Sequence, residues 1–209
     1  MDWLFQSAIN TLQSELTLSS GLAVIVFTLV IRLILMPISF ASLKQTFSNM
    51  QKLAELKPEI EVLKEKYSKD PVLQSQKLME LYKSNGVSLM SKNTVLNMMV
   101  QAVVGIGMFQ GLSNIALSGR LAWIADISKS DIFLSVAVAF ITGLSMYFMP
   151  SAADSVNYAM IALMSVVCLI SLLNVSSAIG LYWGTSSVIS LFQSLAAKLL
   201  FENKRPLVL

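Results

Sequence analysis

One charged residue, Arg32, stands inside a long apolar run of the sequence, LSSGLAVIVFTLVIRLILMPISFA from Leu18 to Ala41. An ionised side chain deep in a bilayer costs on the order of 3 kcal/mol, so such a residue usually faces a wet cavity and binds something of opposite charge. The alternative is that the side chain snorkels to the interface, since Arg32 lies only about 13 Å from Ala41 at ~1.5 Å per helical residue. The other features of the sequence favour the functional role.

Groups suited to covalent or metal chemistry are scarce. The sequence has no histidine and one cysteine, Cys168, which lies in an apolar run and is expected to pack in the core. No cluster of cysteines or carboxylates has the spacing of a metal site. Neither a glycine-rich phosphate loop nor a nucleophile elbow is present. We therefore expect a protein that is not an enzyme, has no cofactor and no metal, and works through non-covalent contacts.

Composition places these residues in a membrane. Hydrophobic residues make up 55 % of the 209 positions and charged residues 13 %, against about 25 % charged residues in a soluble domain. Because open strands leave backbone groups unpaired in lipid, we predict an all-α integral membrane protein with one membrane domain. Five transmembrane helices are predicted, over residues 18–41, 94–117, 131–149, 156–175 and 177–200.

Lysine and arginine set the predicted orientation. The stretch 42–93 holds nine lysines, and three basic residues lie near the C-terminal end. The two basic residues between the second and third spans are offset by two aspartates. By the positive-inside rule, the long loop and the tail over 201–209 are cytoplasmic, and the N-terminus is outside. Five spans require that arrangement.

Two helical segments are predicted outside the spans. Residues 1–17 space Trp3 and several aliphatic residues as an amphipathic helix does, which predicts a helix on the outer surface. In 42–93, apolar residues follow a three-four rhythm up to Tyr67, and Asp70-Pro71 separates them from a second helix that ends at Asn85-Gly86. This predicts a cytoplasmic coiled-coil hairpin. Its lysines suit a surface near anionic lipid or a docking element for a partner.

From about Trp3 to Leu200, the sequence resembles the YidC/Oxa-type membrane protein insertases in their minimal five-span form. Three stretches carry the resemblance: VIRLILMPISFASLKQTFSNMQKLAELKPEIEVLKEKY, EKYSKDPVLQSQKLMELYKSNGV and SSAIGLYWGTSSVISLFQSL. The second span departs from the family pattern, because Ala102-Val103 replaces Met-Pro and its start, SLMSKNTVLNMMV, lacks the usual proline. We expect that span to be straighter than in the family.

The resemblance implies a hydrophilic groove that is open to the cytoplasm and to lipid but closed toward the outside. Helical spacing agrees, because Thr28, Arg32 and Ser39 share one face of the first span. Asn97 and Gln101 are four residues apart, and so are Ser186 and Ser190. For each hydroxyl or amide, the alternative is packing between helices, worth about 0.6 kcal/mol. The predicted groove residues are Arg32, Thr28, Asn97, Gln101, Trp183, Ser186, Ser187 and Ser190, and the predicted hairpin residues are Lys57, Lys64, Lys66, Asp70 and Pro71.

An insertase of this kind moves polar segments of client proteins across the bilayer without nucleotide hydrolysis. A wet groove shortens the low-dielectric path, and Arg32 attracts acidic segments where charges are weakly screened. The client then leaves along the third and fifth spans. Because no carboxylate lies inside a span, we expect water to be the partner of Arg32 at rest.

The resemblance also implies the surroundings of the protein. We expect a multi-pass monomer in the bacterial cytoplasmic membrane, whose partners are nascent membrane-protein clients and the lipid bilayer. The Sec translocon, the signal recognition particle pathway and the ribosome are further candidate partners, with no nucleic acid read directly. Two alternatives stay open: a small transporter or channel with Arg32 as an anion site, and a receptor whose hairpin docks a cytosolic targeting factor.

Overall fold

The computed structural model describes residues 7, 9, 11–14, 17–88, 91–115, 117–149 and 158–202. Within these ranges the elements are helices, joined by turns and loops, and the all-α prediction is confirmed for them. The helices are α2 (Ser20–Glu55), α3 (Lys57–Lys66), α4 (Pro71–Ser84), α5 (Lys92–Asn114), α6 (Ile132–Phe148), α7 (Tyr158–Leu173) and α8 (Ser177–Glu202).

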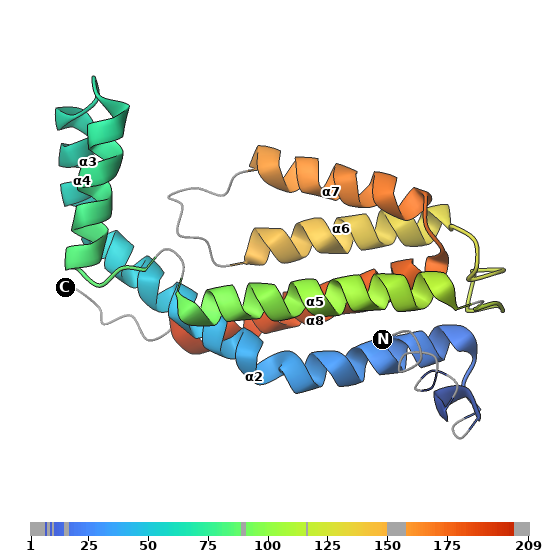
Figure 1. Ribbon diagram of the computed structural model, residues 1–209. Helices are drawn as coiled ribbons and strands as arrows, with labels where there is room; N and C mark the ends of the chain where they lie inside the picture. The colour runs from blue at the N-terminus through green and yellow to red at the C-terminus, as the bar shows by residue number, and fades with distance from the viewer. Residues whose placement is uncertain are drawn as a thin grey trace.

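Two groups of helices differ in direction. The long helices α2, α5, α6, α7 and α8 run roughly side by side, and α3 and α4 project from one end of this bundle (Figure 1). Among the described helices, α2 and α5 are long and apolar enough to cross a membrane, and α6 and α7 are shorter apolar helices. The arrangement of five spans stays a prediction.

The first predicted span differs most from its helix. We expected it to end at Ala41, but α2 continues to Glu55 with Pro37 inside it. Proline lacks a backbone N–H and crowds the preceding turn, which bends a helix without necessarily ending it. The helix turns toward α3 and α4 on its way out of the bundle (Figure 1). The first part of the predicted hairpin is therefore an extension of the Arg32 helix.

Helices α3 and α4 pack on each other through a small apolar core. Leu56, Ile60 and Val87 are buried there. The helix α4 begins at Pro71, and the Asp70 carboxylate accepts the backbone N–H groups of residues 72 and 73 at 3.1 and 3.0 Å. The chain turns after α4 at Gly86, whose φ of 62° is a left-handed value that glycine adopts without strain. This pair thus has its own core and caps.

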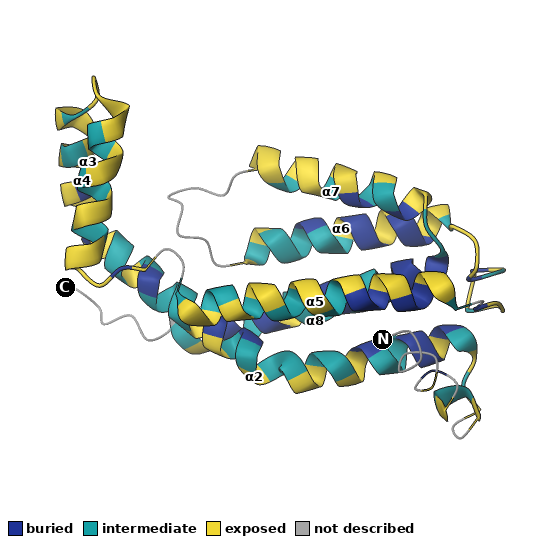
Figure 2. Ribbon diagram, viewed as in Figure 1, coloured by how far each residue is buried: buried dark blue, intermediate teal, exposed yellow. Residues whose placement is uncertain are grey.

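The main core lies at the opposite end of the bundle. Figure 2 shows buried residues gathered toward that end. There Ile9, Val24, Met108 and Ile127 are fully buried in one cluster. The loop between α5 and α6 closes over α8, because the carbonyl of Lys129 accepts both the N–H and the hydroxyl of residue 177, at 2.8 and 2.6 Å. This end is therefore sealed by packed side chains.

The predicted terminal segments are only partly described. Of the amphipathic helix predicted over 1–17, the described residues 7, 9 and 11–14 are helical, and the others up to residue 16, Trp3 included, lie outside the described residues. Ile9 is buried in the main core, so this segment is packed into the bundle at that point. The predicted tail beyond residue 202 also lies outside the described residues.

Helices α6 and α8 approach each other closely at two glycines. Gly180 and Gly184 lie one turn apart on α8 and face Leu134 and Val138 on α6. A Cβ atom built on Gly184 would stand 2.8 Å from the Val138 Cγ2 atom, closer than real carbon contacts. Small residues four apart are a common device for close packing of membrane helices. The seam between α6 and α8 is therefore closed.

We expect Gly184→Ala to destabilise the bundle, because the added methyl group must push stiff, buried Val138 aside. Overpacking of this kind costs about 1–3 kcal/mol. Thermal unfolding of the purified protein in detergent measures the effect. The control is Gly105→Ala on α5, where the nearest atom to an added Cβ is the Tyr182 hydroxyl at 3.8 Å. Equal melting temperatures of the two variants would contradict the close seam.

Removal of the Asp70 cap should loosen the start of α4. We expect Asp70→Ala to cost about 1 kcal/mol, because two backbone N–H groups lose their acceptor. Hydrogen exchange of the amides of residues 72 and 73 should become several-fold faster, whereas Asp70→Asn, which keeps an acceptor oxygen, should protect them. Unchanged exchange in Asp70→Ala would show that the cap is not needed.

Candidate functional site

A cavity of about 650 Å³ lies between α2, α5, α6 and α8. Among its lining residues, Arg32 alone carries a charge. The polar residues that line it with Arg32 are Ser39, Ser42, Thr46, Thr94, Asn97, Gln101, Thr142, Ser145, Tyr182, Trp183, Ser186, Ser187, Ser190, Gln193 and Ser194. The cavity therefore presents many polar side chains and one cation among apolar walls, inside an apolar bundle.

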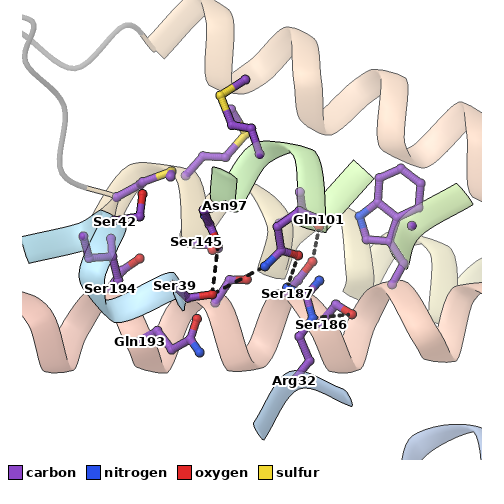
Figure 3. Close-up of a pocket in the computed structure, with 18 of the residues that line it drawn as sticks. Arg32, Ser39, Ser42, Asn97, Gln101, Ser145, Ser186, Ser187, Gln193 and Ser194 are labelled. Atoms are coloured by element: carbon purple, nitrogen blue, oxygen red, sulfur yellow. Dashed lines mark hydrogen bonds between the residues drawn. The ribbon is translucent and has the colours of Figure 1, made fainter. Parts of the chain in front are cut away.

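The Arg32 side chain points from α2 into this cavity (Figure 3). Its Nη1 atom donates to the Gln101 side-chain oxygen on α5 at 2.7 Å, and its Nε atom donates to the Ser186 hydroxyl on α8 at 3.1 Å. Water as the partner of Arg32 at rest stays a prediction, and the structure adds two neutral side chains from flanking helices as partners. This geometry also speaks against snorkelling, in which the side chain would leave the bundle.

A second aromatic residue joins the predicted Trp183 at the cavity. The Tyr182 hydroxyl interacts with both Arg32 and Ser186. Both aromatic residues line the cavity, although only Trp183 was predicted as a groove residue. The Leu-Tyr-Trp pattern was visible in the sequence. It did not reveal that the tyrosine hydroxyl reaches the arginine.

Polar contacts continue from Arg32 along α2 and α5. The Gln101 side-chain nitrogen lies 3.5 Å from the Ser39 hydroxyl oxygen, and that hydroxyl donates to the Asn97 side-chain oxygen at 3.3 Å. Two residues of α2 thus meet two residues of α5, and Figure 3 shows these contacts as dashed lines. The spacing of four between Asn97 and Gln101 brings both amides to the same face, as helical geometry predicts.

On the other side of the cavity, hydroxyl groups join α6, α7 and α8. The hydroxyl groups of Thr142 and Ser187 are 2.9 Å apart, and the Cys168 thiol donates to the Thr142 hydroxyl at 3.9 Å. Cys168 is buried, which confirms the prediction that it packs in the core. Thr142 and Ser145 were not predicted as groove residues. Two hydroxyl residues in an otherwise apolar span do not form a polar stripe long enough to stand out in the sequence.

The structure brings all the predicted groove residues to the cavity except Thr28. Thr28 is fully buried, and its hydroxyl donates to the Val24 carbonyl one turn back at 2.7 Å. A threonine in a helix often satisfies its hydroxyl this way. Sharing a face with Arg32 was therefore not enough to reach the cavity. On α8 the predicted stripe of Ser186 and Ser190 extends further, to Gln193 and Ser194.

The predicted hairpin residues lie away from the cavity, on α3 and at the turn before α4. Asp70 and Pro71 form the start of α4, and the Lys64 carbonyl accepts the Gln74 side-chain N–H at 2.7 Å. The Lys66 ammonium lies 5.5 Å from the centre of the Tyr67 ring. Nearby, a hydrogen bond to Glu80 raises the pKa of the exposed Lys77 ammonium. These contacts shape the hairpin and do not form a second cavity site.

The cavity has an open side between α5 and α6. Both helices line it, but in the described part of the chain they do not pack against each other, whereas each packs against α8. The lining residues Met98 and Phe109 on α5 and Met149 at the end of α6 are apolar and exposed, and Met146 lies one turn before Met149. Methionine adapts its shape to varied apolar surfaces. The seam between α6 and α8, by contrast, is closed at Gly180 and Gly184.

Comparison with known proteins identifies the family to which this chain belongs. Residues 11–204 match the family model described as 60Kd inner membrane protein. The proteins named membrane protein insertase YidC from Staphylococcus aureus strains JH9, Newman and JH1 are each 26 % identical to this chain, over 97 % of the chain and 72 % of the relative. The chain belongs to the 60Kd inner membrane protein family, that is, to the YidC/Oxa-type proteins. The resemblance seen in the sequence is confirmed, and family membership with the apolar helices supports a bacterial inner membrane protein.

Cysteine accessibility should distinguish the cavity from the packed core around it. In a Cys168→Ala background, Ser190→Cys lies at the cavity and should react with a water-soluble maleimide in membranes. Thr28→Cys should react at least tenfold more slowly, because the position is fully buried among helices. Equal labelling rates at the two positions would contradict a hydrated cavity.

Proposed function

We propose that this chain is a membrane protein insertase whose cavity receives polar segments of client proteins. One observation carries the proposal, namely that Arg32 is held inside the cavity by the neutral oxygens of Gln101 and Ser186. Both are acceptors that an anionic group can replace. Family membership supports the same activity.

In this proposal α2, α5, α6, α7 and α8 are the five spans. The nine lysines of 42–93 favour a cytoplasmic position for the projecting helices α3 and α4 and the C-terminus, with the N-terminus outside. The packed core then faces outward and the polar cavity faces the cytoplasm. This orientation suits a protein that receives clients from inside without opening a path across the membrane.

Insertion can proceed without nucleotide hydrolysis or covalent catalysis. A client segment of about 20 apolar residues gains several kcal/mol on entering lipid, and its polar flank is the obstacle. The cavity hydrates that flank over part of the bilayer. A client carboxylate accepts a hydrogen bond from Arg32 as Gln101 does, and its opposite charge adds Coulombic attraction that is weakly screened in the cavity. Replacement of Gln101 by a client carboxylate as the partner of Arg32 is therefore favourable when the polar flank is acidic.

The open side of the cavity indicates a route into lipid. We expected the client to leave along α6 and α8, the third and fifth spans. The close glycine contacts between those helices leave no route between them, and the methionines of α5 and α6 that line the cavity favour passage on that side, along the surface of α6. The polar flank then stays near Arg32 while the apolar segment passes into lipid. The surface of α6 still contributes one wall of the route.

The projecting helices α3 and α4 are proposed to receive clients or a delivery partner. Residues 57–84 carry six lysines and five acidic residues, and this mixed charge suits the headgroup region or a polar partner surface. The Sec translocon, the signal recognition particle pathway and the ribosome are the candidate delivery partners. The cavity is formed within one chain, so a monomer suffices for the proposed activity.

The main test replaces Arg32 and follows clients that differ only in charge. We expect Arg32→Ala to reduce insertion of a client with an acidic translocated segment by about tenfold, as loss of about 1.4 kcal/mol would do, and to leave a neutral version nearly unchanged. Arg32→Lys should retain part of the activity, because it keeps the charge but loses the planar fork of donors. Protease protection in vesicles containing the reconstituted protein measures both.

The matched control is Arg120→Ala, which removes an exposed arginine from the loop between α5 and α6. It should insert both clients as the unmodified protein does. Equal insertion of the acidic client by Arg32→Ala would remove Arg32 from the mechanism. Uptake of small anions by the same vesicles, abolished in Arg32→Ala, would instead favour the transporter alternative.

A further inference from the structure

We propose that Ser39 is a positioning residue that holds the Gln101 amide in the orientation that receives Arg32. The inference rests on the proposed function, because it concerns how the cavity presents its cation to a client. It assigns a role to a residue two helical turns beyond Arg32 that does not itself contact the guanidinium.

The argument begins with the donors of Arg32. A guanidinium has only donors, so the Gln101 side chain must present its oxygen to Nη1, at 2.7 Å. The reverse orientation would place two N–H donors against each other. The Gln101 amide nitrogen then points away from Arg32 and needs an acceptor of its own. An unpaired amide donor in a part-buried site would cost about 1–3 kcal/mol.

Ser39 provides that acceptor, and its hydroxyl group donates in turn to another residue. Its hydroxyl oxygen lies 3.5 Å from the Gln101 side-chain nitrogen. Its own proton goes to the Asn97 side-chain oxygen at 3.3 Å. The orientation of the Gln101 amide is thereby set by Arg32 on one side and supported by Ser39 on the other. The Ser39 hydroxyl in turn links this pair to Asn97.

Position on the helices makes this arrangement possible. Arg32 and Ser39 are seven residues apart, about two turns, and therefore share one face of α2. Gln101 and Asn97 are one turn apart on α5 and meet them in reverse order, so that the two helices are joined at two levels. Ser39 is 6 % exposed and lines the cavity. It is close enough to fix the amide and small enough to leave the cavity open.

The consequence concerns where Arg32 points between clients. With Ser39 in place, the Gln101 amide oxygen keeps the guanidinium in the cavity. A client carboxylate can then take the place of that amide oxygen. Without Ser39, the amide can rotate away, and Arg32 loses its shortest hydrogen bond for part of the time. The long side chain can then reach toward the headgroups, where it no longer serves the cavity. Ser39 thus sets the fraction of time in which the cation is available.

The test is a double-mutant cycle in vesicles containing the full chain. Ser39→Ala should lower insertion of the acidic client about fivefold, the effect of losing one neutral hydrogen bond, and should leave the neutral client unchanged. Ser39→Thr keeps the hydroxyl and should restore insertion of the acidic client. The matched control is Thr28→Val, which removes a buried hydroxyl from the same helix at a position that does not line the cavity.

The cycle separates positioning from general stability. In Arg32→Ala and in Gln101→Leu backgrounds, adding Ser39→Ala should cause no further loss, because the group that it positions is gone. An additive loss in those backgrounds, or an equal loss for acidic and neutral clients, would overturn the inference. Full activity of Ser39→Ala beside an impaired Arg32→Ala would overturn it and leave the proposed function intact. Full activity of Arg32→Ala would overturn the proposed function itself.

Discussion

The hydrogen bonds between the Arg32 guanidinium and two neutral oxygens are the contacts on which the rest of this structure depends. A cation inside an apolar bundle is costly unless it is hydrogen-bonded. Here the acceptors come from Gln101 on α5 and Ser186 on α8, so one residue of α2 draws three helices around a polar space. Because the acceptors carry no charge, the arginine keeps its net charge for a partner. A carboxylate in the same place would have neutralised it.

The remaining packing closes this space at one end of the bundle and along one seam. The core around Ile9, Met108 and Ile127 seals the end of the bundle away from α3 and α4. Gly180 and Gly184 close the seam between α6 and α8. Helices α5 and α6 both line the cavity without packing together, in the part of the chain that the structure describes. The bundle is thus asymmetric, tight where water must be excluded and loose where an apolar segment could leave.

Much of the arrangement could be predicted from the sequence. Apolar runs located the long helices to within a few residues, apart from α2, and a spacing of four located the amides on α5 and the serines on α8. Sequence periodicity could not show that α2 continues through Pro37, because a proline can either bend or end a helix, depending on how the residues after it pack. It also could not show that the Thr28 hydroxyl donates to a carbonyl of its own helix, or that the Ser39 hydroxyl accepts from Gln101. Those outcomes depend on how neighbouring helices approach, which one sequence does not encode in its spacing.

Site-specific crosslinking from α8 tests the central claim most directly. A photoreactive amino acid at Ser190 would face the cavity, and one at Phe192, two residues on and 66 % exposed, would face away from it, since successive helical residues are about 100° apart. During insertion of an acidic client, its polar segment should crosslink to position 190 and not to position 192. Crosslinks to position 192 alone, with none at position 190, would contradict passage of the client through the cavity.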